Sequence, residues 1–295
     1  MNIDPISKRA EYGQSAEKMR PGLYLAATPI GAANDVTLRV LDALARADVI
    51  AAEDTRRAAK LMQIHGIART GRPLIPYHDH NGAEARPGLL KRIQEGAAVV
   101  CVSDAGTPLI ADPGWRLARE AIDLGLMVAP LPGASALLAA LSVAGLPTDR
   151  FLFAGFLPPK KAARRADLAE LASTPATLVF YESPQRLAGA LSDMADVLGN
   201  RSAAVSRELT KLYEETRRDR LSELAAHYAD TGPPKGEIVV TVGPPERREA
   251  TDDEIDEALR VALKLNSTKD AAKEVAERLN LPRKRIYARA LELKL

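Results

Sequence analysis

From Gly22 onward, short runs of β-branched and apolar residues alternate with segments whose apolar residues recur at helical spacing. Such an alternation is typical of a parallel or mostly parallel sheet that is covered by helices. In the first half of the chain the strand-like runs lie at residues 23–27, 49–52, 74–77, 98–103 and 127–130. The pattern therefore predicts an αβ domain that ends near Thr148.

A second series of strand-like runs, again with helical patterns between them, begins just after this point. These runs lie at residues 151–156, 177–181, 203–206 and 237–242. Their number and spacing predict a second αβ domain of comparable size. A cleft between two αβ domains is a natural place for a ligand.

Turn-forming and charged segments divide the chain into four parts. Gly145-Leu-Pro-Thr-Asp149 separates the two series of strands, and Gly243-Pro-Pro245 precedes a charged connector. We therefore expect a flexible N-terminal tail at residues 1–20, αβ domains at 21–148 and 149–245, and a helical tail at 251–295.

The helical tail differs in kind from the rest of the chain. Residues 252–265 form a helical pattern with acidic residues in the first turn, where they complement the helix dipole. Ser267-Thr268 can cap a second helix, Asn280-Leu-Pro282 ends it, and residues 283–293 follow as a third. Two short helices joined by a tight turn are typical of a helix-turn-helix, and the second carries clustered positive charge.

The net charge and the cysteine content restrict which partners and which cellular compartment we expect for this protein. The formal net charge of +2 means that any nucleic-acid contact must come from locally clustered Lys and Arg. The one cysteine, Cys101, excludes an intrachain disulfide, lies in an apolar run typical of a buried strand, and fits a reducing cytoplasm. The N-terminus lacks the apolar segment of a secretory signal.

Residues 124–148 contain no charged side chain and could be mistaken for a membrane-spanning segment. Its prolines and Gly145 leave only residues 134–144 for an uninterrupted helix. This is shorter than the roughly 20 residues that cross a bilayer. The stretch therefore predicts a buried core helix, and we expect no membrane partner.

Three loops rich in glycine, proline and small residues follow predicted strands, at residues 28–31, 103–114 and 131–136. The carboxyl ends of strands are where αβ domains bind ligands, and such loops let a small molecule approach the backbone. The loop at 103–114 carries two glycines, two prolines and two aspartates, more than a simple turn requires. We therefore expect this loop to bind a ligand.

Two common ligand classes lack their motifs here. The chain has neither the glycine-rich phosphate loop of nucleoside triphosphatases nor the Gly-x-Gly-x-x-Gly of dinucleotide-binding domains. His78 and His80 are close in sequence, but Cys101 is remote and the chain holds four histidines, so we predict no metal site.

Eight motifs together give a specific pattern. In sequence order they are Thr28-Pro-Ile-Gly31, Ala52-Glu-Asp-Thr-Arg56, residues 103–114, Pro130-Leu-Pro-Gly133, Phe153-Ala-Gly-Phe-Leu-Pro158, Phe180-Tyr-Glu-Ser-Pro-Gln-Arg186, Arg207-Glu-Leu-Thr-Lys211 and Lys235-Gly-Glu237. With these motifs the chain resembles the ribosomal RNA small-subunit methyltransferase I branch of the tetrapyrrole methylase superfamily. The resemblance covers roughly residues 21–243 and extends to the helical tail.

This resemblance implies two αβ domains of tetrapyrrole-methylase type, a homodimer, and S-adenosylmethionine bound in the cleft between the domains. It also implies the substrate, a cytidine ribose in the decoding region of small-subunit ribosomal RNA. Carried onto this sequence, the cofactor-binding positions are Pro29, Ile30, Gly31, Thr107, Leu109, Ile110, Ala111, Ser135, Ala136, Tyr181, Leu209, Lys235 and Gly236.

Two positions depart from the family pattern. Ala32 stands where the family usually has Asn, and Gln185 stands where it usually has His. The departures put specific polar roles at these two positions in doubt, and Gln185 argues against a general base there.

Transfer of a methyl group from a sulfonium to an alcohol oxygen is an in-line displacement, so the enzyme must mainly align the reacting atoms. A ribose hydroxyl is a poor nucleophile at neutral pH, and a carboxylate or lysine beside it can take or stabilise its proton. The candidates are Asp104, Glu182, Glu208 and Lys211. Asp104 has the alternative role of a turn cap, and Glu208 and Lys211 that of an ion pair. Glu53, Asp54 and Arg56 have the same ambiguity, as first-turn groups or as substrate contacts.

Two clusters of basic residues are candidates for contact with RNA phosphates. They are Lys160, Lys161, Arg164 and Arg165, and in the helical tail Arg283, Lys284, Arg285 and Arg289. For the first cluster a solvated helix face is the alternative. Two other functions stay open at this point: a tetrapyrrole C-methyltransferase, which would need no basic tail, and a non-catalytic RNA-binding protein, which would bind no cofactor.

Overall fold

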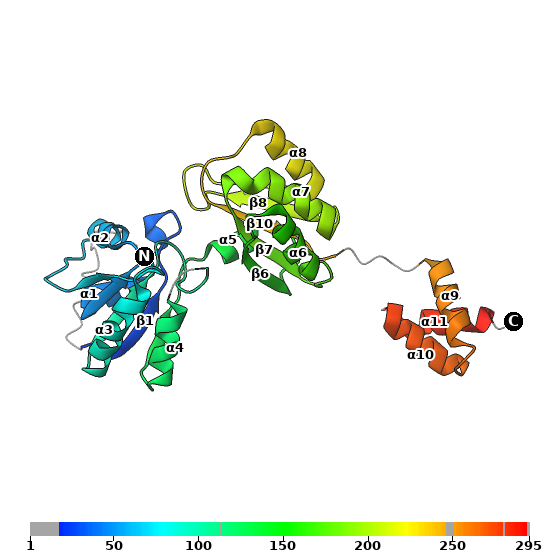
Figure 1. Ribbon diagram of the computed structural model, residues 1–295, viewed down its shortest axis with the longest axis horizontal. Coiled ribbons are helices and arrows are strands. Elements are labelled where there is room, and N and C mark those ends of the chain that lie inside the picture. Colours follow the sequence, from blue (N-terminus) through cyan, green and yellow to red (C-terminus); the bar gives the residue numbers. More distant parts are fainter. Residues whose placement is uncertain (1–17, 112–113, 246–250, 280, 294–295) are drawn as a thin grey trace, which may run out of the picture. The chain divides into compact units, whose positions relative to one another are not determined.

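The computed structural model (Figure 1) describes residues 18–111, 114–245, 251–279 and 281–293. The chain forms two compact units, Met1–Pro245 and Glu246–Leu295. The first contains both sheets and the second is helical. Most of the expected N-terminal tail lies outside the described residues, as do Asp112, Pro113, Asn280 and the last two residues.

The first sheet has the strand order β3-β2-β4-β1-β5 and all of its strand pairs are parallel. Its strands are β1 (Gly22–Ala26), β2 (Val49–Ala52), β3 (Leu74–Pro76), β4 (Ala98–Val102) and β5 (Val128–Leu131). Strands β2 and β4 are buried along their whole length because helices cover both faces of the sheet. The expectation of a parallel sheet is confirmed for this half of the chain, and Cys101 is buried in β4.

Helices cover this sheet in two layers. Residues of α1 (Leu38–Arg46) and α2 (Thr55–Ile64) pack with Ile50 and Val100 on one face. Residues of α3 (Gly82–Gln94) and α4 (Trp115–Asp123) pack with Val49 and Val99 on the other. Neighbouring residues of one strand point to opposite faces, so each strand contributes to both cores.

Helix α5 (Ala136–Val143) is the helix expected in the long uncharged stretch. Leu137, Ala140 and Leu141 are buried, but Leu138 is 53% exposed. The prediction of a buried helix is therefore right for one face only. No helix among the described residues has the length and apolar character needed to cross a bilayer.

The second sheet has the order β6-β7-β10-β8-β9. Its strands are β6 (Phe151–Phe156), β7 (Thr177–Glu182), β8 (Ser202–Arg207), β9 (Glu215–Arg220) and β10 (Ile238–Val242). Only β6 and β7 pair in parallel, whereas β10 runs antiparallel to both β7 and β8, and β9 antiparallel to β8. A mostly parallel sheet is therefore the wrong expectation here. The short β8–β9 connection leaves no room for the helical crossover that parallel neighbours need.

Strand β9, with the sequence Glu-Thr-Arg-Arg-Asp-Arg, is absent from the sequence-based prediction. It lies at the edge of its sheet and pairs only with β8. An edge strand with exposed side chains can be charged along its whole length, so it carries no hydrophobic alternation to detect. Helices α6 (Lys161–Leu171), α7 (Leu187–Leu198) and α8 (Leu221–Thr231) complete this half, with Phe180 and Leu191 among its buried core residues.

The helical unit consists of α9 (Asp252–Ala262), α10 (Thr268–Leu279) and α11 (Arg283–Glu292) around a small core of its own. Thr251 and Glu254 form a capping box at the start of α9. Ser267 Oγ accepts a hydrogen bond from the backbone N–H of Asp270, as expected of a cap for α10. Helix α9 ends at Ala262, three residues before the predicted end at residue 265.

Candidate functional site

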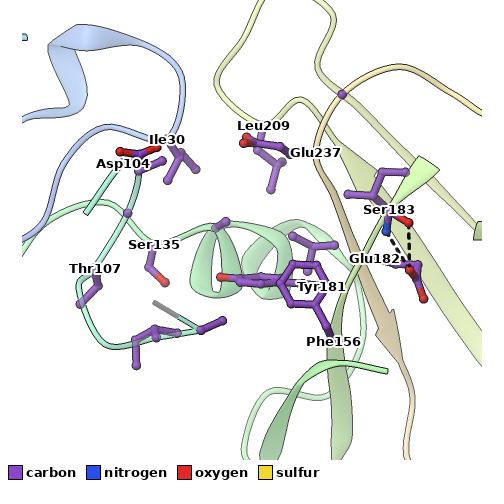
Figure 2. Close-up of a pocket in the computed structure, with 18 of the residues that line it drawn as sticks. Ile30, Asp104, Thr107, Ser135, Phe156, Tyr181, Glu182, Ser183, Leu209 and Glu237 are labelled. Atoms are coloured by element: carbon purple, nitrogen blue, oxygen red, sulfur yellow. Dashed lines mark hydrogen bonds between the residues drawn. The ribbon is translucent and has the colours of Figure 1, made fainter. Parts of the chain in front are cut away.

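A cavity of about 470 Å³ lies in the first unit where the two sheets approach one another. Loops after β1, β4 and β5 line one side, and β7, β10 and the loop after β8 line the other. Figure 2 draws these residues, with Ile30, Asp104, Thr107 and Ser135 on one side and Tyr181, Glu182, Leu209 and Glu237 on the other. Binding pockets for small molecules have volumes of roughly 300–1,000 Å³.

The loop after β4 is held against the loops after β1 and β5. The backbones of Thr28 and Gly106 exchange two hydrogen bonds of 2.9 Å, and Thr107 Oγ1 donates to the Ala134 carbonyl at 3.0 Å. Leu109 and Ala111 adopt the left-handed conformation, with φ of 74° and 60°. Non-glycine residues in this conformation cluster at functional sites, where the surrounding structure holds them in place.

The loop after β8 is strained in the same way and is fastened to the start of β10. Glu208 and Thr210 have φ of 49° and 62°. Lys211 Nζ lies 2.9 Å from the Glu208 carboxylate and 2.7 Å from that of Glu237. Gly236 has φ of 101°, a conformation that favours glycine, and a Cβ atom there would lie 2.2 Å from the Glu208 side chain.

This cluster of charges decides the protonation of its members. The hydrogen bond from Lys211 holds the pKa of Glu208 below its ordinary value. Burial lowers the pKa of Lys211, but hydrogen bonds to Glu237 and Glu208 outweigh it, so the net pKa is raised. Glu208 and Lys211 therefore form a stable ion pair, and neither is suited to accept a proton at neutral pH.

Most of the predicted cofactor-binding residues line the cavity: Ile30, Thr107, Ile110, Ala111, Ser135, Ala136, Tyr181, Leu209 and Gly236. Pro29 and Gly31 instead line a second, smaller hollow beside it. Lys235 lines a third hollow, next to α8, and Leu109 packs against the core under α3 and α4.

The four candidate catalytic residues separate into two pairs. Asp104 and Glu182 line the cavity, whereas Glu208 and Lys211 do not. Glu182 is 3% exposed, and its carboxylate accepts hydrogen bonds from the Ser183 backbone and from Arg186. Asp104 is more accessible, with 31% of its side chain exposed beside Arg57.

Asp104 is also tied to the chain that precedes α2. Its Oδ1 accepts a hydrogen bond from the Asp54 backbone at 2.9 Å, and its Oδ2 lies 3.5 Å from Arg57 Nε. Asp54 itself caps α2, and a hydrogen bond from the Arg56 side chain lowers its pKa to about 2. Asp54 and Arg56 therefore shape the start of the helix, and Glu53 lines the cavity.

Several residues that line the cavity were not predicted from the sequence, among them Arg57, Phe156, Pro184 and Glu237. The last three lie inside quoted motifs, so motif membership was the available signal. Arg57 directly follows one of these motifs and had no signal of its own. Of the two departures from the family pattern, Gln185 is exposed and does not line the cavity, and Ala32 contributes its backbone N–H rather than its side chain.

The basic residues expected to contact RNA have unequal surroundings. Lys160 and Lys161 are exposed, but Arg164 is 8% exposed and lies 2.6 Å from the buried carboxylate of Asp193. Arg165 contacts both Asp193 and Asp196. A solvent-facing position is therefore the wrong expectation for Arg164, because its charge is used inside the fold.

The basic residues of the tail also differ in whether they are paired with a carboxylate. Arg285 lies 3.1 Å from Asp252, and Arg289 lies 2.6 Å from Asp256, so both cations join α11 to α9. Arg283 and Lys284 are exposed and have no ion-pair partner within the described residues. Exposed Tyr287 lies one turn further along α11.

No group of three or more His, Cys, Asp or Glu side chains suited to a metal ion occurs among the described residues. The rings of His78 and His80 stack edge to face at 5.9 Å.

Comparison with known proteins identifies the class. Residues 22–225 match the family model of tetrapyrrole (corrin/porphyrin) methylases, and residues 249–294 match the RsmI C-terminal HTH domain. The fold also resembles that of the methyltransferase CobJ (22% identity, TM-score 0.57, covering 78% of this chain and 97% of that chain). It resembles a uroporphyrin-III C-methyltransferase from Thermus thermophilus, solved with S-adenosyl homocysteine (20% identity, TM-score 0.53, 75% and 97%). The chain is an S-adenosylmethionine-dependent methyltransferase of the tetrapyrrole methylase fold.

Two curated relatives narrow the class to a family. Ribosomal RNA small subunit methyltransferase I of Mesorhizobium japonicum is 50% identical over 281 residues, which cover 95% of this chain and 94% of that protein. The protein of the same name from Escherichia coli O157:H7 is 42% identical over 285 residues, covering 95% and 98%. The chain belongs to the ribosomal RNA small subunit methyltransferase I family. This membership removes the non-catalytic alternative, and the match of the tail disfavours a tetrapyrrole substrate.

Proposed function

We propose that this chain transfers a methyl group from S-adenosylmethionine to the ribose 2′-hydroxyl of a cytidine in the decoding region of 16S ribosomal RNA. The observation that carries the proposal is the cavity between the two sheets. Most of the residues expected to bind the cofactor line this cavity. Membership in the family supplies the substrate, and the helix-turn-helix tail is consistent with it.

The residues present fit the proposed cofactor. Ile30, Ile110 and Leu209 give the cavity an apolar part, and the rings of Phe156 and Tyr181 pack at 5.5 Å beside it. Four carboxylates line the same cavity, those of Glu53, Asp104, Glu182 and Glu237. Apolar and aromatic walls suit an adenine ring, and carboxylates suit a sulfonium and an ammonium group.

When bound, S-adenosylmethionine supplies a methyl group on a positively charged sulfur. The chain's own residues must align the ribose oxygen with that group and manage the hydroxyl proton. Asp104 is the proposed proton acceptor, because among the four candidates it alone lines the cavity with a partly exposed carboxylate. Glu182 is enclosed and bonded to its neighbours, and we assign it to the shape of the wall.

The Glu208–Lys211–Glu237 cluster has a positioning role in this proposal. Lys211 fixes the carboxylate of Glu237, which lines the cavity, and holds the strained loop that carries Leu209. Leu209 then forms part of the wall against which the cofactor packs.

The RNA contacts are assigned to the cations that the fold leaves exposed. In the tail these are Arg283 and Lys284, with Arg285 and Arg289 mainly holding α11 to α9. Near α6 they are Lys160 and Lys161, with Arg165 shared between Asp196 and the buried Asp193. Phosphate contacts of this kind supply much of the affinity for RNA.

The family assignment also suggests where and how the protein works. We propose a homodimer that acts in the cytoplasm, where small ribosomal subunits are assembled. Sedimentation of the purified protein would test the dimer, with a monomer at micromolar concentration as the contrary result.

The proposal is tested by incubating the full chain with small-subunit RNA and labelled S-adenosylmethionine, followed by mass spectrometry of the digested RNA. We expect one added methyl on a cytidine ribose. Methylation of a base, or none with intact subunits, would reject the proposed reaction. A chain that ends at Pro245 should keep cofactor binding by calorimetry but lose activity on subunits, and undiminished activity would reject the role of the tail.

A further inference from the structure

The cavity is strongly one-sided in charge. It is lined by four carboxylates, and Arg57 is the one basic side chain among the described residues on its walls. A carboxylate-rich wall attracts a cationic cofactor but repels RNA, which carries a negative charge on every phosphate. An RNA chain that reaches the cavity therefore needs positively charged side chains nearby to offset the repulsion between its phosphates and these carboxylates.

Arg57 also lines the second hollow, of about 180 Å³, and so does Asp104. The two cavities thus share a wall made by one ion pair, in which Arg57 Nε lies 3.5 Å from Asp104 Oδ2. With 59% of its side chain exposed, Arg57 has room to turn toward either cavity. The Arg57–Asp104 ion pair therefore lies between the carboxylate-rich cavity and the second hollow.

The surface of this second hollow is basic. Lys60 lines the second hollow, is exposed, and has no ion-pair partner within the described residues. Residues 57 and 60 are three apart in α2, which places their side chains on the same side of the helix. The neighbouring Arg56 is bound to Asp54 at 2.7 Å and does not line this hollow.

We propose that the second hollow is a phosphate-binding subsite, in which Arg57 and Lys60 hold the RNA backbone next to the nucleotide that is methylated. The inference rests on the proposed function, since it names the path by which that substrate reaches the cavity. An arginine guanidinium can bind two phosphate oxygens at once, and a lysine ammonium adds a point charge beside it.

Phosphate binding also changes the surroundings of Asp104. When a phosphate binds, Arg57 interacts with both the phosphate and the Asp104 carboxylate. Its ion pair with Asp104 is therefore weaker when the ribose is bound. Asp104 keeps its hydrogen bond from the Asp54 backbone and so keeps its position. Arg57 and Lys60 are positioning residues in this account, and no bond is made or broken at either.

Lys60 offers the cleaner test because, unlike Arg57, it lines the second hollow and not the cofactor cavity. In the full chain, Lys60→Ala should leave the calorimetric Kd for S-adenosylmethionine unchanged and weaken binding of single-stranded substrate RNA several-fold. The slope of log K against log salt should decrease in size by about 0.7, the value for one lost phosphate contact. KM for RNA should rise with kcat nearly unchanged, and Lys60→Arg should restore most of the affinity.

Arg92→Ala is the matched control, since Arg92 is an exposed cation on α3, which packs on the opposite face of the first sheet. An unchanged salt slope in Lys60→Ala, or an equal change in Arg92→Ala, would overturn the inference. Arg57→Lys should weaken RNA binding more than it raises the cofactor Kd, because Arg57 lines both cavities. A cofactor Kd that rises while the RNA affinity stays unchanged would refute the subsite.

The two proposals fail differently. If the unmodified chain binds no S-adenosylmethionine or methylates no RNA, the proposed function is wrong. If it does both and Lys60→Ala matches it in RNA affinity and salt slope, only the phosphate subsite is wrong.

Discussion

The backbone N–H of Ala32 donates a hydrogen bond of 3.0 Å to Oγ1 of Thr210. This bond joins the loop after β1 to the loop after β8, which line opposite sides of the same cavity. It uses the backbone of Ala32, so the loss of the family's usual Asn side chain leaves the contact intact. The neighbouring Gly31 makes the contact possible, since a Cβ atom there would lie 2.5 Å from Thr210 Oγ1 and 2.6 Å from Lys211 Cγ.

Gly31→Ala should therefore push the two loops apart and weaken cofactor binding. Overpacking of this kind costs about 1–3 kcal/mol, and the lower part of that range corresponds to roughly tenfold in Kd. Calorimetry with S-adenosylmethionine measures the change. Gly88→Ala is the control, because Gly88 lies in α3 with open space around it, and its Kd should match that of the unmodified chain. Equal Kd values for both variants would contradict the close approach.

Asp104→Asn tests the proposed proton acceptor. The amide oxygen can still accept the hydrogen bond from the Asp54 backbone, so the loop should keep its shape while the side chain loses its basicity. Loss of a general base lowers kcat by about 100-fold or more. Single-turnover methylation with saturating RNA and cofactor measures it. A kcat within a small factor of the original would exclude Asp104, and a larger effect of Glu182→Gln without loss of stability would shift the role to Glu182.

Lys211→Met tests the ion-pair cluster. It leaves the carboxylates of Glu208 and Glu237 facing each other without a cation, so the loop that carries Leu209 should loosen and the cofactor Kd should rise. Lys211→Arg should recover part of the affinity. Because the pKa of Lys211 is raised above its ordinary 10.5, this side chain stays protonated around neutral pH. A basic limb in the pH profile of kcat that disappears in Lys211→Met would show that Lys211 loses a proton in the reaction.

Asp193→Asn tests the structural role of Arg164. Burial raises the pKa of Asp193, but hydrogen bonds from Arg164 and Arg165 outweigh it and hold the net pKa below 3.8, so the carboxylate is charged at neutral pH. Removing that charge leaves the buried Arg164 unpaired and should lower the free energy of unfolding by about 3 kcal/mol. Asp196→Asn, at an exposed carboxylate that contacts Arg165, should cost less than about 1 kcal/mol. Urea unfolding compares the two, and equal effects would contradict a buried pair.

The tail should become less stable in acid. A hydrogen bond from Arg289 holds the pKa of Asp256 below its ordinary 3.8. A carboxyl with a lowered pKa in the folded state stabilises it above the unfolded pKa, and this stability is lost as the pH falls through the folded value. Hydrogen exchange of α11 amides in the full chain, corrected for intrinsic rates, should show less protection as the pH falls below about 4. Arg289→Gln should remove this dependence and Lys284→Gln should not.

Much of the fold follows from local pattern. The first sheet was predicted strand by strand, because parallel strands buried on both faces read as continuous apolar runs. The tail was predicted from its caps and its helical spacing, although α9 ends earlier than expected. Strand β9 and the antiparallel pairing of β10 were missed, since pairing direction and edge position leave no local hydrophobic signal.

The residues of the candidate site also separate into those that the sequence predicted and those that it did not. The loops, motifs and family resemblance in the sequence pointed to Ile30, Thr107, Ser135 and Tyr181, which line one cavity. The sequence did not show that Lys235 lines another hollow, or that Arg164 is buried against Asp193. Arg57 carried no signal, because its importance comes from lying between two cavities.

The sequence by itself determined most of the segments that become strands and helices, which loops are rich in glycine and proline, and to which family the motifs belong. These are local properties, set by side-chain periodicity and backbone preferences within a few residues. Only the tertiary structure decided which charged groups are paired and which face solvent. Ion pairs such as Arg164–Asp193 and Lys211–Glu237 join residues that are 29 and 26 positions apart, and distance in space rather than in sequence sets their strength.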